Sequence, residues 1–154
     1  CCGKWTTYRN MAQDCVDHAA TLARLDERPC PTRTMNIHGY HRTPEKFGEL
    51  AVYGSDAPAI GDLIRAQPAL GERLHPALPI VAAQAVWAVR MEMARTVEDL
   101  LARRTRALLL DARAAAQAAP QAARLIAAQL GQGEDWVQEQ TQDFQKLAAR
   151  YVLE

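Results

Sequence analysis

The sequence predicts an all-α fold, a compact multi-helix bundle of about six to seven helices. The apolar fraction of 49% is rich in alanine and poor in aromatic residues, and alanine and leucine are strong helix formers. Apolar residues recur at spacings of three and four along most of the chain, and no segment is recognisable as a strand. A chain of 154 residues is also long enough to bury one sizeable core.

The first predicted helix runs from about Thr7 to Leu25, and its mostly apolar stripe needs a partner surface. The stripe residues recur at helical spacing: Met11, Cys15, Ala19, Leu22 and Asp26. Residues 27–42 follow as a connection, because prolines and a glycine interrupt any periodic pattern. We interpret this long segment as a domain boundary.

Residues 43–80 are expected to hold two short helices and a loop. Thr43-Pro44-Glu45 is a strong helix start, with threonine as N-cap and proline at the first helical position. Gly54 ends this helix, and Ser55 can cap the next one. The loop at 68–80 is predicted to be packed because it carries Leu74, Leu78 and Ile80.

Residues 81–110 are predicted to form the centre of the bundle, as two helices that meet near Thr96. Thr96 followed by Glu98 and Asp99 is typical of a fresh N-cap. The residues expected to face the core keep helical spacing: Val86, Val89, Met93, Val97, Leu100, Leu101 and Leu108.

The remaining helices are predicted from their caps. Asp111 is expected to cap a short alanine-rich helix, and Pro120 to open the next helix at an allowed first-turn position. Gly131 is expected to stop that helix. The last helix is predicted from Glu134 to about Val152.

Charge and cysteine content exclude several classes of protein. Eighteen basic residues balance eighteen acidic ones, so no net field attracts nucleic acid or an anionic membrane. Four cysteines without a Cys-x-x-Cys pair form no disulfide framework, which favours a reducing compartment. No signal segment or membrane-spanning run is recognisable, and the chain is expected to be soluble and cytoplasmic.

The candidate ligand site is the opening stretch, Gly3-Lys4-Trp5-Thr6-Thr7-Tyr8-Arg9. A glycine, a lysine and two hydroxyl residues lead into a helix, whose unpaired amides and dipole favour a partly negative ligand atom. The same local pattern also fits a solvated lysine, because a full phosphate-binding loop is absent. No catalytic set is complete, so the isolated chain is expected to be inactive.

Two other clusters carry residue types that could form a site. Cys30, His38 and His41 carry metal-capable atoms but lack a fourth ligand at a zinc spacing, so we predict no metal site. A set of arginines could face nucleic acid: Arg90, Arg95, Arg103, Arg104 and Arg106. Glu92, Glu98 and Asp99 lie at helical-neighbour spacings, so we predict Arg–carboxylate pairs that join helices and no nucleic-acid binding.

Two blocks of the sequence carry a resemblance to a known family. The opening stretch, with Met11-Ala12 and Asp14 after it, is similar to the Gly-Gly-Lys-Trp-Thr-Thr-Tyr-Arg segment of FAD-dependent glycerol-3-phosphate dehydrogenases. Cys2 stands where that family has the first glycine of the pair. The second block, Trp87–Arg106, resembles the signature of the family's C-terminal helical domain.

The resemblance implies a division of the chain and a reaction. Residues 1–26 would be a remnant of the FAD-binding domain, 27–42 a linker and 43–154 the C-terminal helical domain. The intact enzyme would oxidise sn-glycerol 3-phosphate to dihydroxyacetone phosphate, with hydride passing to FAD and electrons to a quinone. Its implied partners are the upstream FAD-binding domain, glycerol 3-phosphate and quinone, with a peripheral location on the inner membrane. A homodimer is left open.

The resemblance also assigns roles to residues of the opening stretch. Lys4 is implied to be catalytic and to contact the cofactor, either by stabilising negative charge on the reduced flavin or by holding the substrate phosphate. Gly3, Thr6 and Thr7 are implied to contact the flavin through amides or hydroxyls. Trp5 and Tyr8 are equally compatible with packing.

Two competing hypotheses remain from the sequence. The chain could be a stand-alone helical protein-interaction module without redox activity, or, less favoured, a DNA-binding domain that uses residues 103–106. Both ends also look cut, because the chain begins inside a motif and Leu153-Glu154 resembles a cloning scar.

Overall fold

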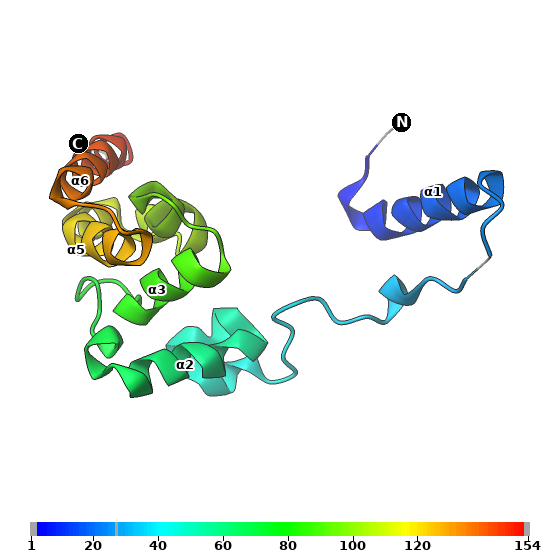
Figure 1. The fold of residues 1–154 in the computed structure, drawn as a ribbon, viewed down its shortest axis with the longest axis horizontal. Helices are drawn as coiled ribbons and strands as arrows, with labels where there is room; N and C mark the ends of the chain where they lie inside the picture. Colours follow the sequence, from blue (N-terminus) through cyan, green and yellow to red (C-terminus); the bar gives the residue numbers. More distant parts are fainter. Residues whose placement is uncertain (1–2, 27, 153–154) are drawn as a thin grey trace. The chain divides into compact units, whose positions relative to one another are not determined.

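The computed structural model describes residues 3–26 and 28–152, which belong to two compact units (Figure 1). Unit 1 spans Cys1–Tyr40 and unit 2 spans His41–Glu154. The predicted all-α fold is confirmed: the regular elements among the described residues are all helices, joined by loops and turns, apart from one isolated bridge between Arg73 and Val81. Cys2 and the Leu153-Glu154 end, both singled out in the sequence, lie outside the described residues.

Unit 1 consists of one helix and a long connection. A 3₁₀ turn, η1 (Trp5–Thr7), leads into α1 (Tyr8–Leu22), and a second 3₁₀ turn, η2 (Pro31–Arg33), interrupts the connection. α1 ends before the predicted Leu25, because Arg24 takes a left-handed conformation with φ 55°. None of the described residues of unit 1 is buried, so unit 1 by itself does not cover the predicted stripe.

Unit 2 is the predicted helical bundle. Its elements follow one another as η3 (Pro44–Asp56), α2 (Ala57–Ala66), η4 (Pro68–Gly71), α3 (Ala82–Met91), the π-helical segment η5 (Asp99–Arg104), α4 (Ala107–Leu110), α5 (Ala112–Leu130) and α6 (Glu134–Ala149). The loop between η4 and α3 is packed as predicted, because Leu74, Leu78 and Ile80 are all buried.

α5 is the central helix of unit 2. It packs against α6, α3 and α4. Its inner face carries small buried side chains: Ala114, Ala115, Ala118, Ala119, Ala122, Ala123, Ile126 and Ala127. Short side chains let the neighbouring helices approach closely.

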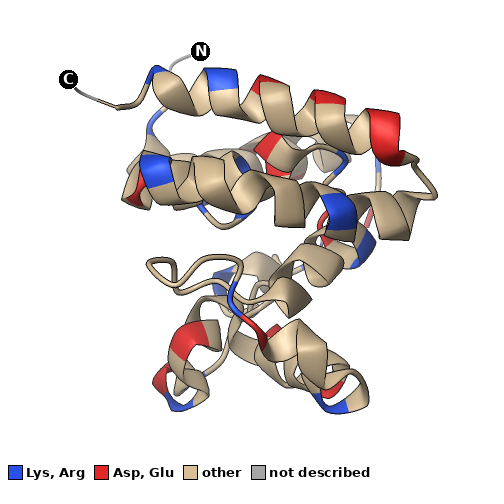
Figure 2. Ribbon diagram, turned by 90° about the vertical axis from the view of Figure 1, so that its left-hand side faces the viewer, with Lys and Arg blue, Asp and Glu red and all other residues tan. Residues whose placement is uncertain are grey.

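The charged residues of unit 2 are spread over its helices with both signs interspersed (Figure 2). This distribution agrees with the zero net charge of the sequence. Within residues 3–26 and 28–152, no helix combines the length and the apolar character needed to cross a membrane.

Two predictions for unit 2 are wrong in detail. The helix predicted at residues 43–54 is 3₁₀ rather than α, and Gly48 breaks it with a positive φ of 57°. Gly54, with φ 53°, interrupts the helical geometry at the predicted end. Met93 was expected in the core but is 75% exposed, because α3 stops at Met91 and Met93 turns the chain with φ 59°.

The prediction that Pro120 opens a new helix is also wrong, since α5 continues through it. Proline lacks the amide that would donate to the carbonyl of Ala116. The side chain of Gln145 on α6 donates to that carbonyl instead, at 3.3 Å. The two caps of α5 are as predicted: Asp111 accepts from the amide of Ala114 at 2.9 Å, and Gly131 ends the helix with φ 68°. The predicted Ser55 cap is wrong, because Asp56 is the N-cap residue of α2.

A reciprocal cap starts the segment at residues 97–104, as Thr96 predicted. The Asp99 amide donates to Thr96 Oγ1 at 3.0 Å, and the Thr96 amide donates to Asp99 Oδ2 at 3.1 Å. Desolvation raises the pKa of Asp99. Hydrogen bonds from Arg95 and Thr96 and the charge of Arg103 outweigh it and hold this pKa below its ordinary value.

Gln84 is a buried polar side chain, 4% exposed, in the core of unit 2. Its Oε1 accepts from the Val81 amide at 2.8 Å, and its Nε2 donates to the Tyr53 hydroxyl at 3.2 Å. One side chain therefore closes the start of α3 and attaches η3 to it. Burial raises the pKa of Tyr53 to about 12, so this hydroxyl stays protonated at neutral pH.

Replacing Gln84 with leucine should destabilise unit 2 by about 2 kcal/mol, because the Val81 amide loses its acceptor inside the core. The free energy of unfolding in urea, followed by circular dichroism, measures this loss. Gln138→Leu on the exposed face of α6 is the matched control and should change stability by less than about 0.5 kcal/mol. Equal losses in the two variants would contradict the role assigned to Gln84.

Asp99→Asn should destabilise unit 2 by about 1 kcal/mol near neutral pH, because the charged acceptor of the cap is lost. The native pKa of Asp99 is lowered from 3.8, so its contribution is complete above that pH and disappears as the pH falls through the native pKa. The free energies of unfolding of the variant and the parent, measured in urea at a series of pH values, should therefore converge as the pH falls. Asp143→Asn, whose carboxylate contacts the exposed Lys146, should show neither effect.

Candidate functional site

The opening stretch forms a turn at the start of α1. Lys4 is extended, with φ −126° and ψ 119°, and η1 follows it directly. The Thr7 amide donates to the Lys4 carbonyl at 3.0 Å, and the Thr7 hydroxyl donates to the same carbonyl at 3.3 Å. The amides of Trp5 and Thr6 precede the first intrahelical hydrogen bond, so they have no acceptor within the helix.

The structure brings the four sequence-predicted site residues onto this one turn. Gly3, Lys4 and Thr6 are exposed, and Thr7 is half-buried. A Cβ atom at Gly3 would meet nothing within 4 Å, so unit 1 itself does not require a glycine there. The turn thus offers an exposed lysine and the exposed hydroxyl residue Thr6, whose donors suit the polar edge of a flavin, whereas the Thr7 hydroxyl already donates to the Lys4 carbonyl.

Trp5 and Tyr8 lie beside the lysine. Their rings stack with centroids 5.5 Å apart, and they are 86% and 63% exposed. The two side chains pack on each other but remain largely uncovered. The start of α1 therefore exposes aromatic surface as well as the polar residues of the site.

The sequence interpretation missed the contacts of Arg9. Its Nη1 donates to Gln13 Oε1 at 2.8 Å and to Thr32 Oγ1 at 3.3 Å, and its Nη2 contacts Asn10 Oδ1. The spacing of Arg9 and Gln13, one helical turn apart, could have predicted the first contact. Nothing in the local pattern indicates the contact with Thr32, which lies on η2.

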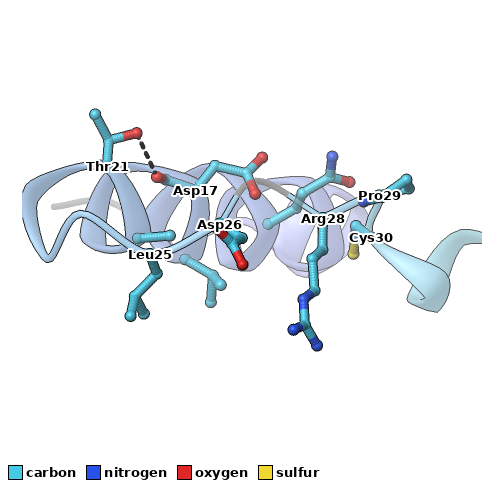
Figure 3. A pocket seen from close by; sticks show the side chains of 10 residues that line it. Asp17, Thr21, Leu25, Asp26, Arg28, Pro29 and Cys30 are labelled. Carbon is cyan, nitrogen blue, oxygen red and sulfur yellow. Dashed lines mark hydrogen bonds between the residues drawn. The ribbon is translucent and has the colours of Figure 1, made fainter.

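A groove runs between α1 and residues 25–26 and 28–30 (Figure 3). Its volume is about 900 Å³, and its lining includes Asp17, Thr21, Leu25 and Cys30. Cys30 Sγ lies 3.0 Å from Thr32 Oγ1. Hydrogen bonds from Thr32 lower the pKa of the Cys30 thiol, and the charge of Arg9 lowers it further.

The histidines show no metal centre. Among residues 3–26 and 28–152, no three His, Cys, Asp or Glu side chains are grouped to hold a metal ion. His75 joins its loop to α5, because its Nε2 contacts Gln117 Oε1 at 2.7 Å. Its Nδ1 accepts from the Ala77 amide at 3.2 Å, which assigns the ring proton to Nε2.

Most of the arginines weighed as a nucleic-acid face have protein partners. Arg103 pairs with Glu98 at 2.6 Å and with Asp99 at 2.8 Å, within its own segment. Arg104 donates twice to the backbone carbonyl of Glu92, at 2.7 and 3.0 Å. Arg90 donates to Gln129 on α5 at 2.8 Å. Among these arginines, the contacts that join elements therefore use carbonyl and amide acceptors, where carboxylates were expected.

Glu92 lies half-buried near two charged groups. Burial raises the pKa of this carboxyl, the Arg104 guanidinium lowers it, and Asp56 raises it. Arg104 donates to the backbone carbonyl of Glu92 and so joins the end of α3 to η5. Its charge also acts on the Glu92 carboxylate.

Comparison with known proteins gives consistent matches. A family described as the C-terminal domain of alpha-glycerophosphate oxidase matches residues 30–141. Glycerol-3-phosphate dehydrogenase of Synechocystis is 37% identical over 67% of this chain and 22% of its own length. Mitochondrial glycerol-3-phosphate dehydrogenase of Mesocricetus auratus is 30% identical over 97% of this chain and 23% of its own length. The Homo sapiens enzyme is 29% identical over 94% of this chain and 22% of its own length.

The chain therefore spans less than a quarter of the length of these relatives. No solved structure matches the chain. The family match covers most of unit 2, including η5 and the arginines around it. The chain belongs to the family of C-terminal domains of alpha-glycerophosphate oxidase.

Proposed function

We propose that this chain is the C-terminal part of an FAD-dependent glycerol-3-phosphate dehydrogenase. The family match over residues 30–141 carries the proposal, and the relatives named as glycerol-3-phosphate dehydrogenases support it. The intact enzyme oxidises sn-glycerol 3-phosphate to dihydroxyacetone phosphate. Bound FAD supplies the acceptor for the hydride, and a membrane quinone receives the electrons.

In this proposal, residues 1–26 complete the upstream FAD-binding domain, 27–42 link the domains, and 43–154 form the C-terminal helical domain. The exposed stripe of α1 supports it: Met11 is 42% and Leu22 86% exposed. An apolar stripe without a cover needs a partner, and the domain that precedes a C-terminal domain in the same chain is the nearest one. A second copy of the protein in a homodimer is the alternative cover for the α1 stripe. The intact enzyme is peripheral on the inner membrane.

Lys4 has the central role in the proposed site. Its ammonium stabilises negative charge that develops during the reaction or holds the substrate phosphate. Gly3, Thr6 and Thr7 hold the flavin through amides and hydroxyls at the helix start. The exposure of the ammonium and the absence of steric contacts at Gly3 both support this assignment.

Lys4→Ala in the full-length enzyme should lower kcat/KM for glycerol 3-phosphate by about 100-fold, because a charged partner of the reacting groups is lost. Steady-state kinetics at matched FAD content measure the effect. Lys146→Ala, which removes an exposed lysine of α6, is the control and should stay within about twofold of the parent. Unchanged kinetics in Lys4→Ala would remove this residue from the site.

The isolated 154-residue chain should be helical, colourless and inactive, because it lacks most of the flavin-binding domain. Circular dichroism, the visible absorbance of flavin and an assay of glycerol-3-phosphate oxidation test this. Flavin bound at near one-to-one stoichiometry would contradict the division of the chain. A full-length protein without flavin or activity would instead favour the helical interaction module.

A further inference from the structure

A polar cluster links the helix that follows Lys4 to the connection. Arg9 and Gln13 contribute from α1, and Cys30 and Thr32 from the connection. The Arg9 guanidinium contacts both segments at once, with Gln13 Oε1 at 2.8 Å and Thr32 Oγ1 at 3.3 Å. A planar guanidinium suits this task because its donors point in several fixed directions.

This cluster is among the least exposed parts of unit 1. No described residue of the unit is buried, and only six are half-buried: Thr7, Arg9, Gln13, Ala20, Cys30 and Gly39. Three of the six belong to the cluster. With no apolar core in unit 1, hydrogen bonds of this kind must hold the connection against α1.

The cluster also lies next to the proposed flavin site. Residues 4–7 form a turn, called here the Lys4 turn, which the amide and hydroxyl of Thr7 close by donating to the Lys4 carbonyl. Thr7 lies two positions before Arg9. Movement of the first turn of α1 therefore moves both the Lys4 turn and Arg9. Because Arg9 fixes the first turn of α1 to η2, the orientation of the Lys4 turn before it is restricted.

We propose that Arg9 is a positioning residue for Lys4. By binding Thr32, it holds the first turn of α1 against the connection that leads to unit 2, and so orients the Lys4 turn. Its guanidinium acts through protein groups and touches neither substrate nor cofactor. The inference rests on the proposed role of Lys4 in the flavin site.

The contact itself can be tested in this chain through the reactivity of Cys30. With Cys1, Cys2 and Cys15 replaced by serine, the alkylation rate of Cys30 near neutral pH reports its thiolate fraction. Thr32→Val should slow alkylation most, by roughly threefold, since Thr32 makes the dominant hydrogen bonds to the thiol. Arg9→Gln should slow alkylation less than Thr32→Val does. Arg9→Lys should give a rate between those of Arg9→Gln and the parent.

Arg33→Gln is the matched control for this measurement. Arg33 lies on η2 beside Thr32, is exposed, and its replacement removes the same charge. It should leave the alkylation rate unchanged. Equal rates for the Arg9→Gln and Arg33→Gln variants would overturn the proposed contact.

The positioning role is tested by a double-mutant cycle in the full-length enzyme. Arg9→Gln should lower kcat/KM for glycerol 3-phosphate by about tenfold while the FAD content stays normal. On the Lys4→Ala background it should add less than about twofold, because a residue that acts through Lys4 has nothing left to orient. A full tenfold loss on that background would show an independent structural effect and overturn the inference.

The two proposals fail in different ways. If Lys4→Ala leaves the kinetics unchanged, the flavin-site role of Lys4 fails and the positioning role of Arg9 fails with it. If Lys4→Ala is impaired while Arg9→Gln matches the parent or acts additively, only the inference about Arg9 fails.

Discussion

Close packing around α5 is the constraint on which unit 2 depends. The helix presents alanines to its neighbours, and most of them are completely buried. Such a face excludes water only if the neighbouring helices approach closely, so a larger side chain at these positions would force them apart. This packing also explains why α5 can accommodate Pro120. α6 lies near enough for Gln145 to reach the carbonyl of Ala116, which proline leaves without its usual donor.

Unit 1 has no comparable interior. Its helix exposes apolar side chains along its length, and polar contacts such as those of Arg9 connect it to the rest of the unit. A short helix without tertiary packing is marginal in water, so this arrangement implies a surface supplied from elsewhere. The flavin domain proposed above would provide that surface and would give the Lys4 turn a function. The contrast between the units therefore supports the division between a catalytic domain and a helical one.

Much of unit 2 follows from its sequence, because its signals are local. Caps at Thr96 and Asp111 and the stop at Gly131 act within a few residues, and the structure has all three. The continuation of α5 through Pro120 was not predictable, because it depends on Gln145 from another helix. The 3₁₀ geometry of η3 was missed because it depends on two glycines with positive φ, which also fit an ordinary helix end.

The candidate site was predicted as a loop that leads into a helix, and the structure has Lys4 directly before η1 and both threonines within it. Their chemical roles come from family resemblance, since an exposed lysine at a helix start has no local feature that distinguishes a ligand site from a solvated surface. Arg9 was overlooked for a related reason. Its contact with Thr32 joins positions separated by 23 residues, which no periodic pattern connects.

The most direct test of the account is hydrogen exchange of the α1 amides in two proteins, the 154-residue chain and the full-length enzyme. If unit 1 completes a flavin domain, α1 should exchange rapidly in the chain and become strongly protected in the full-length enzyme with FAD. Amides of α5 should be protected in both, which controls for the folding of unit 2. Equal protection of α1 in the two proteins would contradict the account, because the helix would then need no upstream partner.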